Sequence, residues 1–96
     1  PHAGKVEYSR LQLRLDDIRV NKTGGLLVVA LDWNNLKGNG TPYRYRIFWH
    51  DARGGVLSSA DQGWRNVTMN HGYYTMKLVA KNAEAEDFRL TIVKDK

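Results

Sequence analysis

The residues that decide the fold are Tyr-Arg-Tyr-Arg-Ile-Phe-Trp-His-Asp-Ala-Arg-Gly-Gly at positions 43–55, where aromatic and basic side chains alternate before a glycine turn. Side chains of a β-strand point alternately to the two faces of its sheet. Tyr43, Tyr45, Ile47 and Trp49 share one face of this strand, so we expect that face to lie in the core. The opposite face carries Arg44 and Arg46 and is mostly solvated. The stretch therefore predicts a β-strand with one buried face.

The length and composition are those of a small globular domain. The chain has 96 residues, 42% of them hydrophobic, with three tryptophans and only two prolines. At this length about two thirds of the surface of the unfolded chain can be buried around one core. We expect one β-sandwich domain over residues 1–96, in which residues 1–5 are disordered or foreign to the domain. The longest apolar run, residues 26–31, is far shorter than the roughly 20 residues that span a bilayer.

The first half of the chain predicts strands separated by glycine turns. Residues 10–20 alternate between apolar and polar side chains, and the alternation slips at Asp16-Asp17, which predicts a β-bulge. A turn over residues 21–25 follows. Residues 26–35 begin apolar on both faces, which favours a central strand covered on both sides at its start and emerging at its end. Turns at residues 37–41 and 51–55 predict two hairpins, and hence a three-stranded meander.

The second half continues with short strands and no helical period. Residues 58–66 lack periodicity and are expected to cross between sheets, with Trp64 as an anchor. Residues 67–69, 73–81 and 88–93 predict three strands. Together these segments predict an immunoglobulin-like β-sandwich of about seven mainly antiparallel strands, with a closed five-stranded barrel as the competing fold. The expected core comprises Leu13, Leu15, Leu27, Val29, Leu31, Tyr45, Ile47, Trp49, Leu78, Phe88 and Leu90.

The formal net charge is +5, and most of the excess lies in the first half. Residues 1–50 hold eight Lys or Arg against four acids, whereas residues 51–96 hold seven against six. A basic balance favours polyanionic partners, but screening over about 8 to 10 Å weakens that argument unless the charges form a patch. The chain has no Cys, which excludes disulfides, thiol nucleophiles and zinc sites built on Cys.

The sequence offers no catalytic or metal-binding constellation. His2, His50 and His71 lack the short spacing of metal ligands. The serines lack a Gly-x-Ser-x-Gly elbow, and His50 and Asp51 point to opposite faces of a strand. The acidic residues at positions 84–87 fit a solvated turn. We therefore expect a protein that is not an enzyme, with no catalytic residues, no metal site and no cofactor.

The strongest candidate for a binding site is the outward face of the strand at residues 43–50. Arg44, Arg46, Phe48 and His50 share this face, with the two arginines about 6.6 to 6.8 Å apart. Basic and aromatic side chains interleave in the same way in oligonucleotide-binding barrels. Arg14 and Arg89 extend the face if their strands share it. The structural alternative, which we favour, is that the arginine stems cover apolar surface while their heads stay in water.

Two segments resemble a known family. Tyr-Arg-Ile-Phe-Trp-His-Asp-Ala-Arg-Gly at residues 45–54 and Val-Ala-Lys-Asn-Ala-Glu-Ala-Glu-Asp-Phe-Arg-Leu-Thr-Ile at residues 79–92 resemble the YcfL-like family of small proteobacterial envelope proteins. Many members are predicted lipoproteins of unknown function. The resemblance covers residues 11–93. This chain departs from the pattern in lacking the lipobox Cys and in having Ala80-Lys81 where the family has Ala-Pro.

The resemblance implies an immunoglobulin-like sandwich in the periplasm, free or anchored to the outer membrane as a lipoprotein. Because the chain begins at Pro1 rather than Met, we expect an upstream segment to have been removed. The expected function is a non-catalytic binding or scaffolding module of the Gram-negative cell envelope. Its expected partner is an envelope protein, with membrane contact only through an N-terminal lipid anchor that this chain lacks. The alternative is binding of single-stranded nucleic acid or another polyanion, although we expect no nucleic-acid partner.

Overall fold

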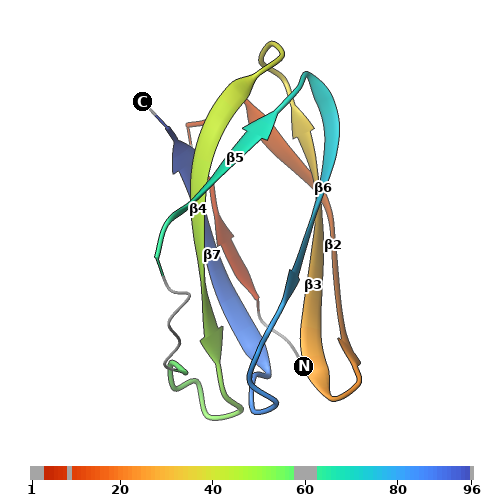
Figure 1. The fold of residues 1–96 in the computed structure, drawn as a ribbon, viewed down its shortest axis with the longest axis vertical. Helices are drawn as coiled ribbons and strands as arrows, with labels where there is room; N and C mark the ends of the chain where they lie inside the picture. The colour runs from red at the N-terminus through yellow and green to blue at the C-terminus, as the bar shows by residue number, and fades with distance from the viewer. Residues whose placement is uncertain (1–3, 9, 58–62, 96) are drawn as a thin grey trace.

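The computed structural model describes residues 4–8, 10–57 and 63–95, and these ranges contain seven β-strands and no helix (Figure 1). Within them, accordingly, no helix is available that could cross a membrane. The predicted all-β fold of about seven strands is confirmed. The strands are β1 (Lys5–Glu7), β2 (Leu13–Thr23), β3 (Leu26–Asn35), β4 (Thr41–His50), β5 (Arg65–Met69), β6 (Gly72–Val79) and β7 (Asp87–Lys94).

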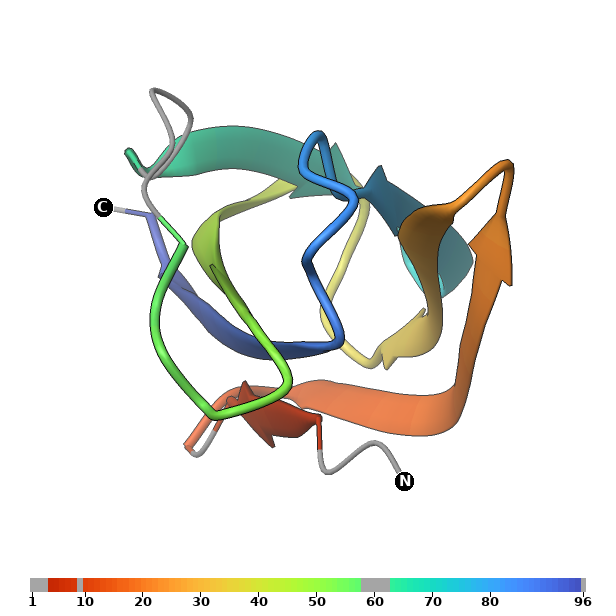
Figure 2. The same cartoon turned by 90° about the horizontal axis from the view of Figure 1, so that it is seen from below.

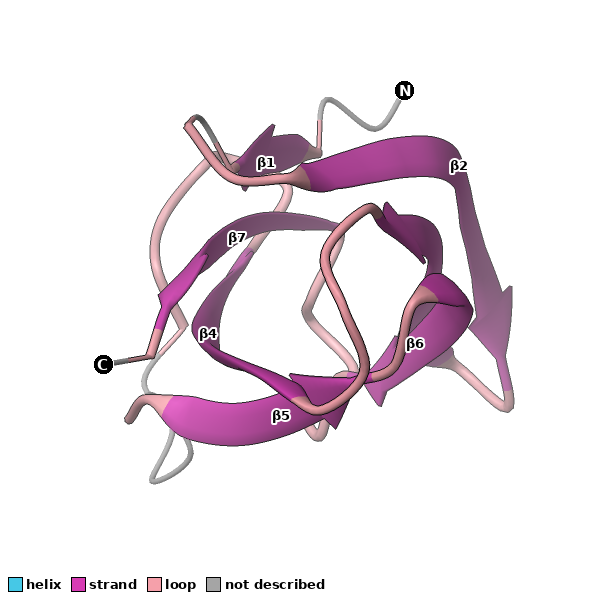
Figure 3. Ribbon diagram, turned by 90° about the horizontal axis from the view of Figure 1, so that it is seen from above, coloured by secondary structure: helices cyan, strands magenta, loops and turns pink. Residues whose placement is uncertain are grey.

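Two sheets face each other and form a sandwich. One sheet has four strands in the order β1-β7-β4-β5, and the other has three in the order β2-β3-β6. Neighbouring strands are antiparallel except for β1 and β7, which are parallel. Seen end-on, the two layers lie on opposite sides of the interior (Figure 3). Four strands opposite three is the strand count of a constant-type immunoglobulin sandwich, and the competing barrel with one continuous sheet is wrong.

Local sequence determines the β2–β3 hairpin. Its turn residues, Gly24 and Gly25, have positive φ angles of 59° and 83°, which glycine adopts without a steric penalty. Along the hairpin the register shifts between Leu15 and Asp17, so the bulge predicted at Asp16-Asp17 is confirmed. The bulge keeps Leu15 and Ile18 on the core side even though two residues separate them.

The predicted meander is wrong, because β3 and β4 belong to different sheets. The chain crosses between the sheets four times, after β1, β3, β5 and β6. The segment expected to cross, residues 58–66, joins two neighbouring strands of one sheet, and residues 58–62 lie outside the described part. The second predicted hairpin is reduced to one bridge between His50 and Val56. Both sheets have one apolar face, so the sequence pattern did not reveal which strands pair.

The side chain of Asn35 fastens the crossing between the sheets after β3. Its side chain is fully buried at the end of that strand. The amide Nδ2 donates to the carbonyl oxygens of Asn70 at 3.1 Å and Met69 at 3.3 Å. Its Oδ1 accepts from the hydroxyl of Tyr43 at 2.9 Å and the N–H of Lys37 at 3.2 Å. Because a buried amide is costly without such partners, Asn35 ties the end of β3 to the start of β4 and the end of β5.

The core lies between the two sheets and differs in part from the prediction. Leu15, Tyr45, Trp49 and Leu78 were expected to be buried, but they are only partly buried at its margin. As predicted, β3 is the central strand of its sheet, and each of its residues is buried or partly buried. The expectation of an emerging end is wrong, because burial alternates in the same way along the whole strand. The sequence analysis missed Trp33, which is fully buried near that end. The other buried hydrophobic residues absent from the expected core are Tyr43, Met69, Met76, Ala80, Ala85 and Ile92.

Candidate functional site

The predicted binding face lies on the outside of the four-stranded sheet. Arg44, Arg46, Phe48 and His50 alternate along β4 with side chains of the core. Both neighbours of β4, namely β5 and β7, lie in the same sheet. The structure therefore brings all four side chains onto one surface, with β7 beside them along the whole stretch and β5 beside β4 only as far as Tyr45.

Trp64, immediately before β5, completes this face. The guanidinium carbon of Arg46 lies 4.7 Å from the centroid of the Trp64 ring and 5.0 Å from that of Phe48. The guanidinium carbon of Arg44 lies 5.4 Å from the Trp64 centroid, and its Nε is 3.6 Å from Oδ1 of Asp95. Ring faces attract cations at such distances. Sequence reasoning assigned Trp64 to a crossover; the available signal was a tryptophan in a polar segment near an arginine-rich strand.

Of the two arginines expected to extend the face, one does so. Arg89 of β7 lies opposite Phe48 in the sheet register and shares its side. Arg14 lies on β2 in the other sheet, where its Nε donates to Asp16 at 2.6 Å. His50 closes its own turn, since its Nδ1 lies 3.0 Å from the carbonyl oxygen of Gly54. At this end of the sandwich the loops after β4 and β6 lie side by side (Figure 2), and the N–H of Glu86 donates to the carbonyl of His50 at 2.8 Å.

The stacking limits what this face can bind. A nucleic-acid base would need an aromatic ring face on which to stack. Trp64 and Phe48 already carry guanidinium groups against a ring face. A base that stacked on that face would have to displace these cations, although phosphate groups could still approach arginine N–H donors. The arrangement therefore fits an intramolecular role, in which two arginines hold the Trp64 segment against β4.

A second candidate site is a pocket of about 280 Å³ between the sheets, beside β6. β5 and β6 meet at one end of the molecule and diverge toward the other (Figure 1). Pairing of β4 with β5 stops at Tyr45 and Arg65, so β5 does not extend along the second half of β4. The lining residues are Tyr45, Ile47, Trp49, Arg65, Lys77, Leu78, Val79 and Lys81.

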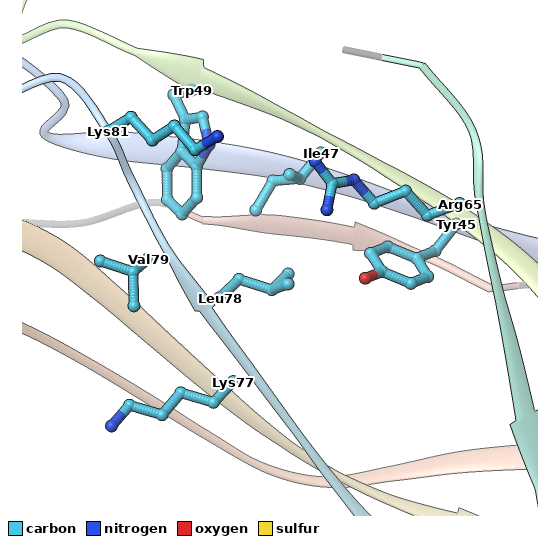
Figure 4. A pocket seen from close by; sticks show the side chains of 8 residues that line it. All are labelled: Tyr45, Ile47, Trp49, Arg65, Lys77, Leu78, Val79 and Lys81. Carbon is cyan, nitrogen blue, oxygen red and sulfur yellow. The ribbon is translucent and has the colours of Figure 1, made fainter. Parts of the chain in front are cut away.

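The pocket combines an apolar floor with cationic side chains. Figure 4 shows the guanidinium of Arg65 and the hydroxyl of Tyr45 turned toward the enclosed space, whereas the ammonium of Lys77 points away from it. Lys81 and Trp49 line the same pocket, and in Figure 4 they are seen at one end of it. None of the described residues that line the pocket is acidic. A site of this kind favours apolar groups accompanied by negative charge.

The backbone beside the pocket forms an open sheet edge. The N–H of Ala80 donates to the carbonyl of Leu27 at 2.9 Å, in register with the β3–β6 ladder. Since the backbone groups of an antiparallel strand point alternately to its two sides, those of Leu78 point toward β3 as well. Those of Lys77 and Val79 point away from it. In the described part of the chain no strand lies on that side of β6.

The outer face of the three-stranded sheet carries an ionic network. Arg19 of β2 donates to Asp17 and Asp32, each at 2.7 Å, and the hydroxyl of Thr75 on β6 donates to Asp32 at 2.9 Å. The hydrogen bond from Arg19, followed by that from Thr75, holds the pKa of Asp32 below its ordinary value. The hydrogen bonds that Arg19 donates to Asp32 and Asp17 raise its own pKa. The network joins all three strands across the sheet, and the sequence analysis did not identify it.

A family model described as "Protein of unknown function (DUF1425)" matches residues 5–94. The chain belongs to the DUF1425 family. No curated protein matches this sequence.

Two solved structures share the fold of this DUF1425 chain. The crystal structure of Campylobacter jejuni cj0090 has a TM-score of 0.82 and 20% sequence identity, with 96% of this chain and 99% of that chain covered. A DUF1425 family member from Shewanella sp. pv-4 has a TM-score of 0.75 and 13% identity, with 88% of this chain and 79% of that chain covered. At these identities the similarity establishes the β-sandwich fold.

Of the other two histidines, His71 holds a loop in place. In this DUF1425 chain Nδ1 of the His71 ring lies 2.9 Å from the carbonyl oxygen of Lys37, and the backbone N–H of His71 donates to the side chain of Asn39. His2 lies outside the described residues. Across the described ranges, no three side chains of the metal-ligating types gather closely enough to hold an ion.

Proposed function

We propose that this DUF1425 chain is a non-catalytic binding module of the Gram-negative cell envelope, and that it takes a protein partner along the open edge of β6. The observation that carries the proposal is this edge. Backbone donors and acceptors of Lys77 and Val79 point outward there, beside an apolar pocket. An extended segment of another protein can add to such an edge by main-chain hydrogen bonds, with specificity from alternate side chains.

The chemistry of the two candidate surfaces supports a binding role without catalysis. The outer face of β4 presents guanidinium and aromatic groups, and the pocket presents cations around an apolar floor. Neither surface, as described, places a general base beside a nucleophile. The resemblance of residues 11–93 to YcfL-like proteins supports a periplasmic location, free or tethered by an upstream lipid anchor.

Photo-crosslinking in the native host tests the partner. A photo-reactive phenylalanine analogue replaces Tyr73 on β6 or, as the control, Lys22 on β2. We expect a discrete protein adduct from position 73 only. The adducted protein is then identified, purified and titrated against wild type, Val79→Thr and Val79→Pro. Proline removes the outward N–H at this position, whereas threonine keeps the N–H and the branched shape.

We expect Val79→Thr to bind the purified partner about as tightly as wild type and Val79→Pro to bind at least about tenfold more weakly. Equal affinity of the proline variant would show that β6 is not the docking edge. Fractionation of cells that express the full-length gene tests the location, and recovery in the cytoplasm would overturn it.

Polyanion binding by the face of Arg44, Arg46 and Phe48 is the alternative. Arg89 and Trp64 enlarge this face, which supports it. The occupied ring faces favour the intramolecular role instead, and we expect no specific binding of oligonucleotides.

A further inference from the structure

The geometry of β6 determines the pattern of any strand that adds to it. Backbone groups of Thr75, Lys77 and Val79 point away from β3, so an added strand would pair with these three residues. Their side chains are on the exposed, outer side of the sheet. Residues of the added strand directly opposite them would also point outward. Residues between those would point inward, as Met76 and Leu78 do.

The inward side chains of such a strand would reach the pocket. Sheets in a sandwich lie about 10 Å apart, so one layer of side chains fills the space between them. Opposite the open half of β6 the pocket is floored by Tyr45, Ile47 and Trp49 of β4. Apolar inward side chains would bury surface against this floor. Arg65 and Lys81 line the same pocket and disfavour basic side chains at the inward positions.

The outward side chains would meet Lys77. Residues directly opposite each other across a strand pair interact most strongly, and opposite charges are favourable there. Lys77 is the one charged residue of β6 and lies in the open half of the strand. An acidic side chain opposite it is therefore preferred, whereas a basic one is repelled.

Charge also excludes the simplest occupant, a second copy of this chain. Antiparallel pairing of two β6 strands around their open halves would bring two copies of Lys77 close together. Arg65 and Lys81 of both copies would add to the repulsion. Lys77 thus acts like the edge lysines that prevent self-association while leaving the backbone accessible.

From these observations, and resting on the proposed function, we propose that the partner segment is an extended strand that alternates apolar with acidic residues. Its apolar side chains enter the pocket lined by Ile47, Trp49 and Leu78, and an acidic side chain lies opposite Lys77. The alternation holds for parallel and antiparallel addition, because it depends only on the two faces of the sheet.

Three labelled peptides of about nine residues test this pattern. All have Val or Ile at every second position, with Glu, Lys or Ser at the positions between. Each is titrated against wild type, Lys77→Glu, Val79→Pro and Val79→Thr by fluorescence anisotropy. Thermal unfolding confirms that each variant is folded. Amide chemical shifts locate the bound peptide on the protein.

We expect the Glu peptide to bind at least about tenfold more tightly than the Lys peptide, with shifts at Lys77, Val79 and the pocket. Lys77→Glu should reverse this preference. Val79→Pro should weaken the Glu peptide about tenfold, and Val79→Thr should leave its affinity within about twofold of wild type.

Other outcomes separate the two levels of the proposal. Equal binding of all three peptides, lost in Val79→Pro, would retain edge docking and overturn the acidic pattern. No binding of any peptide would overturn the acidic pattern and count against the docking edge itself.

Dodecanoate is titrated in parallel, because one acyl chain with a carboxylate shares the chemistry of the pocket. Saturable dodecanoate binding with pocket shifts, and no peptide binding, would assign the pocket to a small amphiphile instead.

Discussion

The two edges of the three-stranded sheet are built in opposite ways. β2 is interrupted by a bulge at Asp16, and ion pairs of Arg14 with Asp16 and of Arg19 with Asp17 run along it. β6 continues for eight residues without a register shift. Along β6, Tyr73 and Val79 have exposed fractions of 79% and 46%. The β2 edge is thus blocked by irregular backbone and paired charges. The β6 edge is regular and partly apolar, and its one charged residue is Lys77.

This difference shows that edge protection in the molecule is selective. Natural proteins suppress pairing at exposed edges by bulges and inward or clustered charges. The chain uses both devices on β2 and only one on β6, where the pocket also lies. An edge left open beside a pocket favours a specific occupant, whereas an edge closed by a bulge favours none.

The largest expected effect comes from Trp33, which lies between the two edges. It pairs with Leu15 of β2 and Tyr74 of β6, and its ring is fully buried. Trp33→Ala should lower the free energy of unfolding by about 3 to 5 kcal/mol. Trp49→Ala, at the half-buried pocket margin, should cost about half as much. Chemical denaturation measures both, and a larger loss in Trp49→Ala would show that the pocket is not open.

Trp33→Phe serves as the matched control for that experiment. Nε1 of Trp33 is buried and has no hydrogen-bond partner among the described residues. Phenylalanine keeps most of the ring and removes this polar atom. Its cost should therefore be well below that of alanine.

The next largest effect is expected on the outer face of the four-stranded sheet, which includes neither β2 nor β6. Arg44→Ala with Arg46→Ala removes three guanidinium–ring contacts and should cost about 1 to 2 kcal/mol in the free energy of unfolding. Titration of a labelled oligonucleotide at two salt concentrations measures the same face as a binding site. Wild type and double variant should both bind weakly and lose binding alike as salt rises.

Specific oligonucleotide binding, tight at physiological salt, lost in the double variant and unchanged in Val79→Pro, would contradict the view that the β6 edge is the functional one. A salt dependence that becomes shallower in the double variant would identify these arginines as the phosphate contacts.

Replacement of Lys77, the one charged residue of β6, tests directly whether the two edges differ. Lys77→Val should make the protein self-associate at least about tenfold more tightly than wild type, since the repulsion is gone and the backbone remains accessible. Lys22→Val on β2, which also removes the ion pair of Lys22 with Glu86, should not, because the bulge still interrupts that edge. Sedimentation velocity over a concentration series measures both variants. Equal behaviour of the two would show that the edges are equivalent.

The smallest expected effect is a pH dependence of the stability contributed by the network of Arg19, Asp32 and Thr75, which joins β2, β3 and β6. The pKa of Asp32 is lowered in the folded protein, so its ion pair contributes stability above about pH 4, the ordinary range for Asp. The contribution is lost as pH falls through the lowered pKa. Denaturation midpoints from neutral to acid pH should show this loss in wild type and a smaller one in Asp32→Asn. Parallel curves for the two proteins would contradict the assignment.

Local features were predictable from the sequence, but which strands pair with one another was not. Alternation and glycine turns predicted the strands, and the slip at Asp16-Asp17 predicted the bulge, because each depends on a few consecutive residues. The pairing of β4 with β7 and β5 depends on residues far apart, and the buried amide of Asn35 fastens the crossing into the other sheet.

The candidate site also has one part that the sequence predicts and one part that depends on the sheet order. The side chains of Arg44, Arg46 and Phe48 share a face because of strand periodicity, which the sequence shows. The stacking of Trp64 on that face and the open edge of β6 both require the sheet order. Without the sheet order, the sequence could not identify β6 as an open edge.

The parallel pairing of β1 with β7 sets the time at which this molecule can finish folding. Lys5 lies opposite Arg89, and the hydroxyl of Thr91 donates to Glu7 across a separation of 84 residues. The four-stranded sheet therefore cannot be completed until the last strand has been synthesised. Among the described strands, β2 and β3 form the one ladder joined by a tight turn, and the other ladders pair segments that lie farther apart in the chain. A topology so rich in non-local pairs places folding in the range of milliseconds to seconds, an interval in which the apolar faces of both sheets are exposed to other proteins.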